Sequence, residues 1–245
     1  MNIRLRRPIS AGLGAFALLL GSGAACADSS DFDWLGIAYL WAPEIGADIR
    51  DRGVDIAFSD VIDKLETGFL GHVEAQGDDL GGFVDVVFMG VGDNVSRPLA
   101  DLNADLDMTL MDLALVWSPA AERFSGVEAF GGLRYLSADF DLVVDPLPPA
   151  LPTIETGIDK GYTDVLLGAR YAAPINDQWR LLFSVDLSGG DSEGSWRVAG
   201  FGVYRSGPHR LYAGYRHLDA EIEARGDERL TLTFSGPAIG YGFAF

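Results

Sequence analysis

Nine charged residues stand inside otherwise apolar segments, and they carry the clearest chemical potential of the chain. If each segment is extended, its charged residues share one face, because side chains alternate across a β-strand. Carboxylates that face guanidinium groups form ion pairs, or they line a polar passage. The nine residues are Glu74, Asp85, Asp112, Glu128, Arg134, Asp164, Arg170, Asp186 and Arg216.

Two interpretations of this charged set remain open. In the first, the charges pair across a narrow interior, because a buried charge without a partner costs several kcal/mol. In the second, the same side chains line a narrow pore. Acids outnumber arginines in the set, so such a pore would prefer cations or small polar solutes. We favour the paired interior and keep the cation-preferring channel as the alternative.

The segments around these charges alternate apolar and polar residues over the length of a strand. One segment, 194–206, has no clear inward face, and Trp196 fits either side. Alternation of this kind predicts strands that are apolar toward lipid and polar inward in a closed barrel. It recurs over 69–76, 107–117, 127–135, 162–171, 179–187 and 211–216.

Turn residues set the number of strands. Short connections at 77–79, 118–123, 174–178 and 206–209 alternate with longer acidic or proline-rich segments near 50–66, 96–104, 144–155, 188–194 and 224–229. We therefore predict an all-β fold, a closed antiparallel up-and-down transmembrane β-barrel of about ten strands, with eight or twelve as alternatives. The predicted strands are 32–48, 67–76, 80–94, 105–118, 124–143, 156–173, 179–188, 194–206, 209–223 and 229–245.

An even number of strands places both ends of the barrel domain on the periplasmic side of an outer membrane. Outward aromatic residues at that end would form an interfacial girdle. These residues are Trp117, Tyr171, Trp179 and Phe243.

Two segments do not fit simple alternation. In the last strand, Leu230, Leu232 and Phe234 lie on even positions, whereas the apolar residues of 239–245 lie on odd ones. A β-bulge near Pro237 would reconcile the two halves. Residues 58–66 instead predict a helical turn in the first outer loop.

The last strand ends on an aromatic residue, a pattern typical of outer-membrane barrels. Ile239, Tyr241, Phe243 and Phe245 fall on every second position, and alanine or glycine stands between them. We predict that Tyr241, Phe243 and Phe245 form the signal read by the barrel-assembly machinery during insertion.

The first 27 residues predict a secretory signal peptide. Three arginines precede an apolar run over 9–20, and 25–27 is a small-residue cleavage site. The run is shorter than the about 20 residues that a spanning helix needs. Lipidation of Cys26 is the alternative, although Gly23 replaces the aliphatic residue that such a site favours.

Cleavage would leave residues 28–245 as one barrel domain with no cysteine. The mature domain would carry 15 basic and 36 acidic residues. This balance argues against nucleic acid, because phosphate-binding surfaces are basic. No linker or fixed-period repeat divides the domain, and we expect a monomer.

Several segments together resemble a family of uncharacterised proteobacterial outer-membrane β-barrel proteins. The segments are 39–43 (YLWAP), 58–65 (FSDVIDKL), 68–75 (GFLGHVEA), 132–136 (GLRYL), 168–171 (GARY) and 214–219 (GYRHLD). More remotely, the chain is similar to small OmpA-like and OmpW-like barrels. The resemblance implies an outer-membrane location and a barrel fold, and it implies no activity. The expected partners are outer-membrane lipid and lipopolysaccharide.

Catalysis is a third interpretation, and it depends on three histidines. His72 stands beside Glu74, where a hydrogen-bonding role is expected, and His209 lies in a short turn. His217, near Asp219, is the remaining candidate for a base in a lipid A-modifying enzyme. No G-x-S-x-G pattern supplies a nucleophile, so we predict no enzyme.

No metal or cofactor site is predicted either. Acidic residues recur at the proposed outer ends of strands, but their spacing does not match an EF-hand loop. We interpret them as a solvated rim, with divalent bridging to lipopolysaccharide phosphates as the alternative. They are Asp101, Asp105, Asp107, Asp139, Asp141 and Asp145.

Overall fold

The computed structural model describes residues 32–49, 52–56, 65–97, 100–120, 122–146, 154–223 and 229–245. Among the described residues no helix has the length and apolarity needed to cross a membrane. The predicted signal peptide, residues 1–27, lies outside the described residues. The strands are β1 (Asp33–Trp41), β2 (Glu44–Ile49), β3 (Arg52–Ile56), β4 (Leu65–Gln76), β5 (Leu80–Arg97), β6 (Ala100–Trp117), β7 (Gly126–Pro146), β8 (Ile154–Pro174), β9 (Trp179–Gly190), β10 (Gly194–Ser206), β11 (His209–Glu223) and β12 (Arg229–Ala244).

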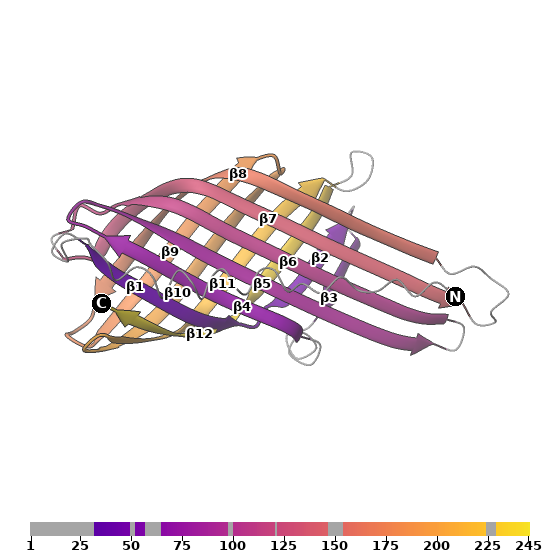
Figure 1. Cartoon of the computed structure of the whole chain (residues 1–245), viewed down its shortest axis with the longest axis horizontal. Coiled ribbons are helices and arrows are strands. Elements are labelled where there is room, and N and C mark those ends of the chain that lie inside the picture. Colours follow the sequence, from indigo (N-terminus) through magenta and orange to yellow (C-terminus); the bar gives the residue numbers. More distant parts are fainter. Residues whose placement is uncertain are drawn as a thin grey trace, which may run out of the picture. The chain divides into compact units, whose positions relative to one another are not determined.

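The strands form one antiparallel sheet that closes on itself (Figure 1). Strand β1 pairs with β4 on one side and with β12 on the other, for example through Leu35, which faces both Glu74 and Ala244. All strands except β2 and β3 belong to the closed ring, which therefore has ten members. The predicted all-β, ten-stranded, up-and-down barrel is confirmed.

The two ends of the barrel differ in their connections. We call one the turn end: it carries the short turns 77–79, 118–125, 175–178 and 207–208 together with Phe245. There the backbones of Trp34 and Phe245 exchange two hydrogen bonds of 2.9 Å, which fasten the last residue to the first strand. The opposite end is the hairpin end.

The first predicted strand, 32–48, is interrupted at Pro43. A proline has no N–H to donate to a neighbouring strand, so β1 ends at Trp41 and β2 continues along β12. Strand β3 then folds back on β2 as an additional strand that the sequence did not predict. The predicted helical turn over 58–66 lies largely outside the described residues, but its last two positions belong to β4.

At the hairpin end, strands extend into the predicted long connections wherever the structure describes most of such a segment, as over 96–104. Strands β5 and β6 remain paired as far as Arg97 and Ala100, and β7 extends to Pro146. Strands β5 to β8 consequently run beyond their neighbours (Figure 1). Because acidic residues are depleted in strands in general, these acidic segments were wrongly predicted to be loops. Backbone pairing across the hairpins satisfies the main chain regardless of side-chain type.

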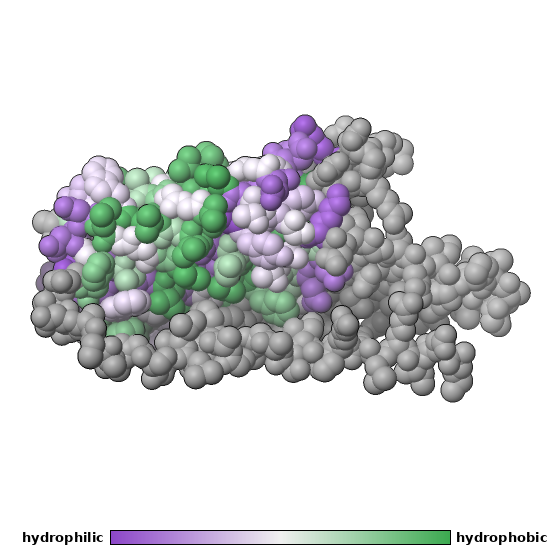
Figure 2. Space-filling view, turned by 45° about the horizontal axis from the view of Figure 1, so that its top comes forward, coloured by the Kyte–Doolittle hydropathy of each residue, from purple (hydrophilic) through white to green (hydrophobic). Residues whose placement is uncertain are grey.

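The exterior of the barrel is apolar, as alternation predicts. Leu115, Val127 and Leu187 are each more than half exposed. Figure 2 shows hydrophobic residues gathered in a band across the visible face, with hydrophilic residues toward both ends. A contiguous exposed apolar surface of this kind marks contact with a membrane or a partner. Trp117, Tyr171, Trp179 and Phe243 are all exposed, in the girdle position predicted for them at the turn end.

The bulge predicted in the last strand is wrong. Strand β12 pairs with β11 in one continuous register from Arg229 to Phe243. Its even positions face inward throughout, so Leu232 and Phe234 are buried inside the barrel. At Gly236 an added Cβ would lie 2.1 Å from the carbonyl oxygen of Ala42, and the strands approach closely because that side chain is absent.

The reason for this error is an apolar layer inside the hairpin end, which we call the apolar plug. Leucine and phenylalanine in β12 belong to this layer, so apolar character does not distinguish lumen from lipid there. Its side chains fill the lumen at close contact, as in small barrels in general. Its largest members are Trp41, Met89, Met108, Leu110, Tyr162, Leu218, Ile222 and Phe234.

Candidate functional site: the charged lumen

All nine charged residues predicted to face inward lie in the interior of the barrel. Eight are buried, and the side chain of Arg170 is 13% exposed. They come from seven different strands, so their contacts span the lumen. The structure places Glu74 on β4, Asp85 on β5, Asp112 on β6, Glu128 and Arg134 on β7, Asp164 and Arg170 on β8, Asp186 on β9 and Arg216 on β11.

The central cluster consists of Asp112, Arg134, Asp186, Ser195 and Arg197. Arg134 donates to both carboxylate oxygens of Asp112, from Nε at 2.8 Å and from Nη2 at 2.9 Å. The same Nη2 donates to Asp186 at 2.7 Å, and Nη1 donates to Ser195 at 3.0 Å. The side chain of Arg134 is fully buried. Bidentate, charge-assisted hydrogen bonds are the strongest kind in proteins, and here they join the neighbouring strands β6 and β7, while the bond to Asp186 reaches β9.

Arg197 completes the central cluster, and the sequence did not identify it. Its Nε donates to Asp186 at 2.7 Å, and its Nη2 lies 2.8 Å from Asp112. Inward positions of β10 also include Phe201 and Val203. These apolar residues hid the alternation from which Arg197 could have been found. Trp196, which fitted either face, is exposed on the outside.

Asp164 faces the lumen, and the hydrogen bonds that it accepts within the described structure come from serines and not from an arginine. It accepts hydrogen bonds from the hydroxyls of Ser188 at 3.0 Å and Ser192 at 2.6 Å. Ser188 is in turn 2.7 Å from Ser195, which receives Arg134. Asp164 therefore fixes the β9–β10 connection and reaches the central cluster through serines.

A second cluster lies closer to the turn end. Arg170 pairs with Glu74 through both terminal nitrogens and with Glu128 through Nε. Glu128 also accepts a hydrogen bond from Gln76, whose oxygen receives the backbone N–H of Phe124. Phe124 has a φ of 55°, a left-handed conformation that is uncommon for a bulky residue. The cluster holds the turn over the lumen in this conformation.

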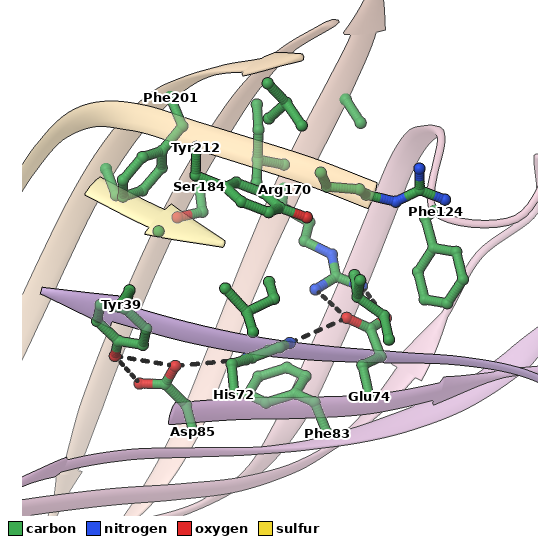
Figure 3. Close-up of a pocket in the computed structure, with 18 of the residues that line it drawn as sticks. Tyr39, His72, Glu74, Phe83, Asp85, Phe124, Arg170, Ser184, Phe201 and Tyr212 are labelled. Carbon is green, nitrogen blue, oxygen red and sulfur yellow. Dashed lines mark hydrogen bonds and ion pairs between the residues drawn. The ribbon is translucent and has the colours of Figure 1, made fainter. Parts of the chain in front are cut away.

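His72 links the second cluster to Asp85, which also binds Tyr39 and lies 3.9 Å from Arg197 of the central cluster. His72 lies 3.2 Å from Glu74 and 3.3 Å from Asp85 through its two ring nitrogens. Tyr39 donates to Asp85 at 3.0 Å and accepts from Arg216 at 2.8 Å. Figure 3 shows Tyr39, Asp85, His72, Glu74 and Arg170 joined in this order along one side of the cavity.

Between these clusters and the turn end the lumen holds a cavity of about 190 Å³. Its floor is formed by the charged residues just described. Its walls are mainly apolar, and Figure 3 shows Phe83, Phe124, Phe201 and Tyr212 around it. At the turn end it is lined by Arg180, Arg205 and Arg210. These three arginines were not among the predicted site residues.

The two remaining histidines lie outside this network. His217 contacts the hydroxyl of Ser235 through Nδ1, and its ring lies 4.6 Å from that of Trp196. Asp219, considered as its acidic neighbour, instead accepts a hydrogen bond from Thr233 at 3.2 Å. His209 lies 2.7 Å from the hydroxyl of Tyr241 at the turn end.

The acidic rim and the assembly residues also have definite positions. In the part of the chain that the structure describes, no group of three or more His, Cys, Asp or Glu side chains is arranged to hold a metal ion. Asp107 and Asp139 are direct cross-strand partners on β6 and β7. Tyr241, Phe243 and Phe245 all lie exposed on the barrel exterior at the turn end.

Solved structures give a further measure of the fold. No family model and no curated protein matches the sequence. The outer membrane protease OmpT from Escherichia coli superposes with a TM-score of 0.50 at 9% identity, covering 91% of this chain and 99% of that one. Ail of Yersinia pestis, solved with the heparin analogue sucrose octasulfate, has a TM-score of 0.41 at 9% identity, with 88% and 99% covered. The transport unit of the Escherichia coli autotransporter AIDA-I has a TM-score of 0.40 at 10% identity, with 98% of each chain covered. The chain thus has the fold of bacterial outer-membrane β-barrels.

Proposed function

We propose that this protein is a structural outer-membrane β-barrel whose lumen is sealed against ions. The single observation that carries the proposal is the central cluster, in which Arg134 bridges Asp112 and Asp186 with a side chain that is fully buried. Its carboxylates already bind guanidinium groups. They therefore cannot act as free ligands for a cation moving through the barrel.

The apolar plug provides a second barrier on the hairpin side of the central cluster. Ions cross apolar layers only at high cost, because burying an unpaired charge costs several kcal/mol or more. Met108, Leu110 and Phe234 are each about 1% exposed, so the layer leaves them little contact with solvent. A conducting state would require movement of both the plug and the charged residues.

The proposal includes location and orientation. The apolar exterior and the girdle at the turn end fit an outer membrane, where aromatic side chains collect at the interfaces. With ten strands in the ring, both ends of the barrel domain lie at the turn end. We assign that end to the periplasm, where short turns are the rule for bacterial outer-membrane barrels.

An ion-flux assay tests the sealed lumen. The protein is refolded into vesicles loaded with potassium, and the dissipation of a diffusion potential is followed with a voltage-sensitive dye. We expect dissipation no faster than in vesicles without protein. A general porin refolded in the same lipid controls for insertion and should dissipate the potential at once. Rapid, protein-dependent dissipation would refute the sealed lumen.

A further inference from the structure

The cavity at the turn end has three chemically distinct levels, and their order is set by strand alternation. On β9, β10 and β11, an arginine stands near the turn end of each strand, apolar residues line the lumen further in, and charged residues lie deeper still. We call Arg180, Arg205 and Arg210 the arginine rim. All three line the cavity, and none of them takes part in the central cluster.

The arginine rim holds more positive charge than its neighbours balance. Arg205 and Arg210 are direct cross-strand partners in the β10–β11 register, and like charges in that position destabilise an antiparallel pair. Among the described residues, one carboxylate is paired with the rim: Glu122 binds Arg180 and lies 3.4 Å from Arg205. Three guanidinium groups thus share a single acid.

The rim also leaves buried donors unused. The side chain of Arg180 is only 8% exposed, and its Nε has no hydrogen-bond partner among the described residues. Arg205 Nε and Arg210 Nη1 are buried in the same unpartnered state within the described structure. Buried donors are nearly always satisfied in folded proteins, so the rim has fewer hydrogen-bond acceptors around it than its guanidinium groups can use.

Between the arginine rim and the charged floor, the walls of the cavity form an apolar surface of limited size. Leu35, Phe83, Phe130, Leu182 and Val203 line it. The edge of the Phe83 ring meets Phe130 at a centroid distance of 5.3 Å. A cavity of about 150 Å³ with such walls binds benzene. The space of about 190 Å³ in this barrel therefore suits one ring or a short aliphatic chain.

The charged floor determines which end of the cavity suits an anionic group. Glu74, Asp85 and Glu128 line it together with Arg170 and Arg216, and the two arginines are already engaged with Glu74, Glu128 and Tyr39. Two nitrogens of Arg216 have no hydrogen-bond partner in the described part of the chain, but Arg216 lies 3.7 Å from Asp85 and 4.7 Å from the centre of the Trp41 ring. An anionic group is therefore better placed at the rim than at the floor.

We propose that this cavity binds a small amphipathic carboxylate, which enters from the turn end. The carboxylate accepts hydrogen bonds from the arginine rim, whose forked guanidinium groups match carboxylate geometry. The ligand's ring or short chain packs against the apolar walls. This site does not depend on whether the lumen conducts, because the ligand enters and leaves by the same end.

Binding of 4-fluorophenylacetate to the full barrel in lipid nanodiscs tests the proposal. The probe is followed by fluorine NMR, and 2-(4-fluorophenyl)ethanol is the neutral control of matching size. We expect saturable broadening and shift of the acid signal, with the alcohol binding at least about tenfold more weakly, since hydrogen bonds to a charged partner are worth about 1.5–3 kcal/mol. Empty nanodiscs correct for partition into lipid.

Substitutions locate the binding. Arg205→Gln and Arg210→Gln should each weaken the acid about tenfold, and Val203→Trp should abolish binding by filling the cavity. Arg229→Gln is the matched control, because Arg229 is exposed at the hairpin end and pairs with Glu193. A heat-modifiable gel shift verifies that each variant is folded.

Three results would overturn the proposal. Equal affinity for acid and alcohol would show an apolar cavity without anion recognition. Acid binding that survives both rim substitutions would place the carboxylate elsewhere. No saturable response to the acid in the folded wild-type barrel would show that the cavity does not accept this ligand class.

Discussion

At the scale of single residues, the interior is held by charges that pair between neighbouring strands and also across the lumen, as Arg197 does with Asp112. Arg134 connects β7 to β6 and β9, and Arg197 closes the same group from β10. Such a group is stable only while its members remain complete, because each buried charge is compensated by the others.

Removing Arg134 should therefore cost much more than removing an exposed arginine. We expect Arg134→Ala to lower the free energy of unfolding by about 3–5 kcal/mol, because Asp112 and Asp186 lose their compensation. Arg229→Ala, which removes an exposed ion pair, should cost about 0–1 kcal/mol. Urea-dependent unfolding in phospholipid vesicles measures both, and equal losses would contradict the buried cluster.

The sequence predicted inward charges well wherever the apolar residues of a strand all faced lipid. It missed Arg197 because Phe201 and Val203 share the inward face of β10. Of the arginine rim, Arg180 lay on the inward face of the predicted segment 179–187 but was not included in the charged set, and Arg205 and Arg210 lay beside a turn, outside the alternating segments. Tyr39 and Gln76 resemble ordinary strand residues until the barrel closes and brings β1 and β4 beside the charged strands.

At the scale of elements, closure depends on strands that approach one another too closely for a side chain. Gly214 faces the lumen on β11, and a Cβ there would lie 2.0 Å from the carbonyl oxygen of Gly200 and 2.7 Å from the Cα of Phe201. Both are backbone atoms, which cannot move without opening the β10–β11 pair.

Gly214→Ala should consequently destabilise the barrel by about 1–3 kcal/mol, the range typical of overpacking. Gly189 is the matched control, because an added Cβ at that strand residue meets no atom within 4 Å. We expect Gly189→Ala to change stability by no more than about 0.5 kcal/mol. Unfolding midpoints in urea give the comparison, and a tolerated alanine at position 214 would show that β10 and β11 are not this close.

The outward faces of the strands give a test of membrane contact. Leu113 lies between the exposed Met111 and Leu115 in the apolar outward row of β6 and is 54% exposed, whereas Leu80 begins β5 at the turn end and is 64% exposed. Arginine on the lipid face of a barrel costs about 2–4 kcal/mol at the midplane and about 0–1 kcal/mol near an interface. We therefore expect Leu113→Arg to destabilise the protein in vesicles far more than Leu80→Arg. Similar costs for the two would place the membrane elsewhere on the barrel.

Pairing also explains which elements the sequence could and could not define. Strand positions were predictable from alternation and turn residues. The extra strand β3 and the hairpin extensions were not, because their acidic residues resemble loop composition. The inward face of β12 was predicted wrongly for a different reason. Leu232 and Phe234 are apolar because they contribute to the apolar plug, although they face the lumen.

At the scale of the whole molecule, a barrel with an apolar exterior must reach a membrane before it aggregates. Tyr241, Phe243 and Phe245 lie on the outside of the closing strand, where assembly machinery could reach them before β12 pairs with β1. We expect Phe243→Ala with Phe245→Ala to lower the folded protein in the outer-membrane fraction severalfold in cells. Refolding of the same variant from urea should be nearly normal.

Ile239→Ala is the control for this prediction, since Ile239 occupies the same outward face further from the chain end. It should leave insertion in cells unchanged. If the double variant is inserted as well as the wild type, the terminal aromatics are not the assembly signal.

The central claim is that the lumen is sealed, and planar-bilayer recording of single barrels tests it most directly. Folded, inserted wild-type protein should give no steady conductance steps in molar potassium chloride. Steady, cation-selective steps that shrink when Asp112 or Asp164 is changed to asparagine would contradict the account and make the charged lumen a pore.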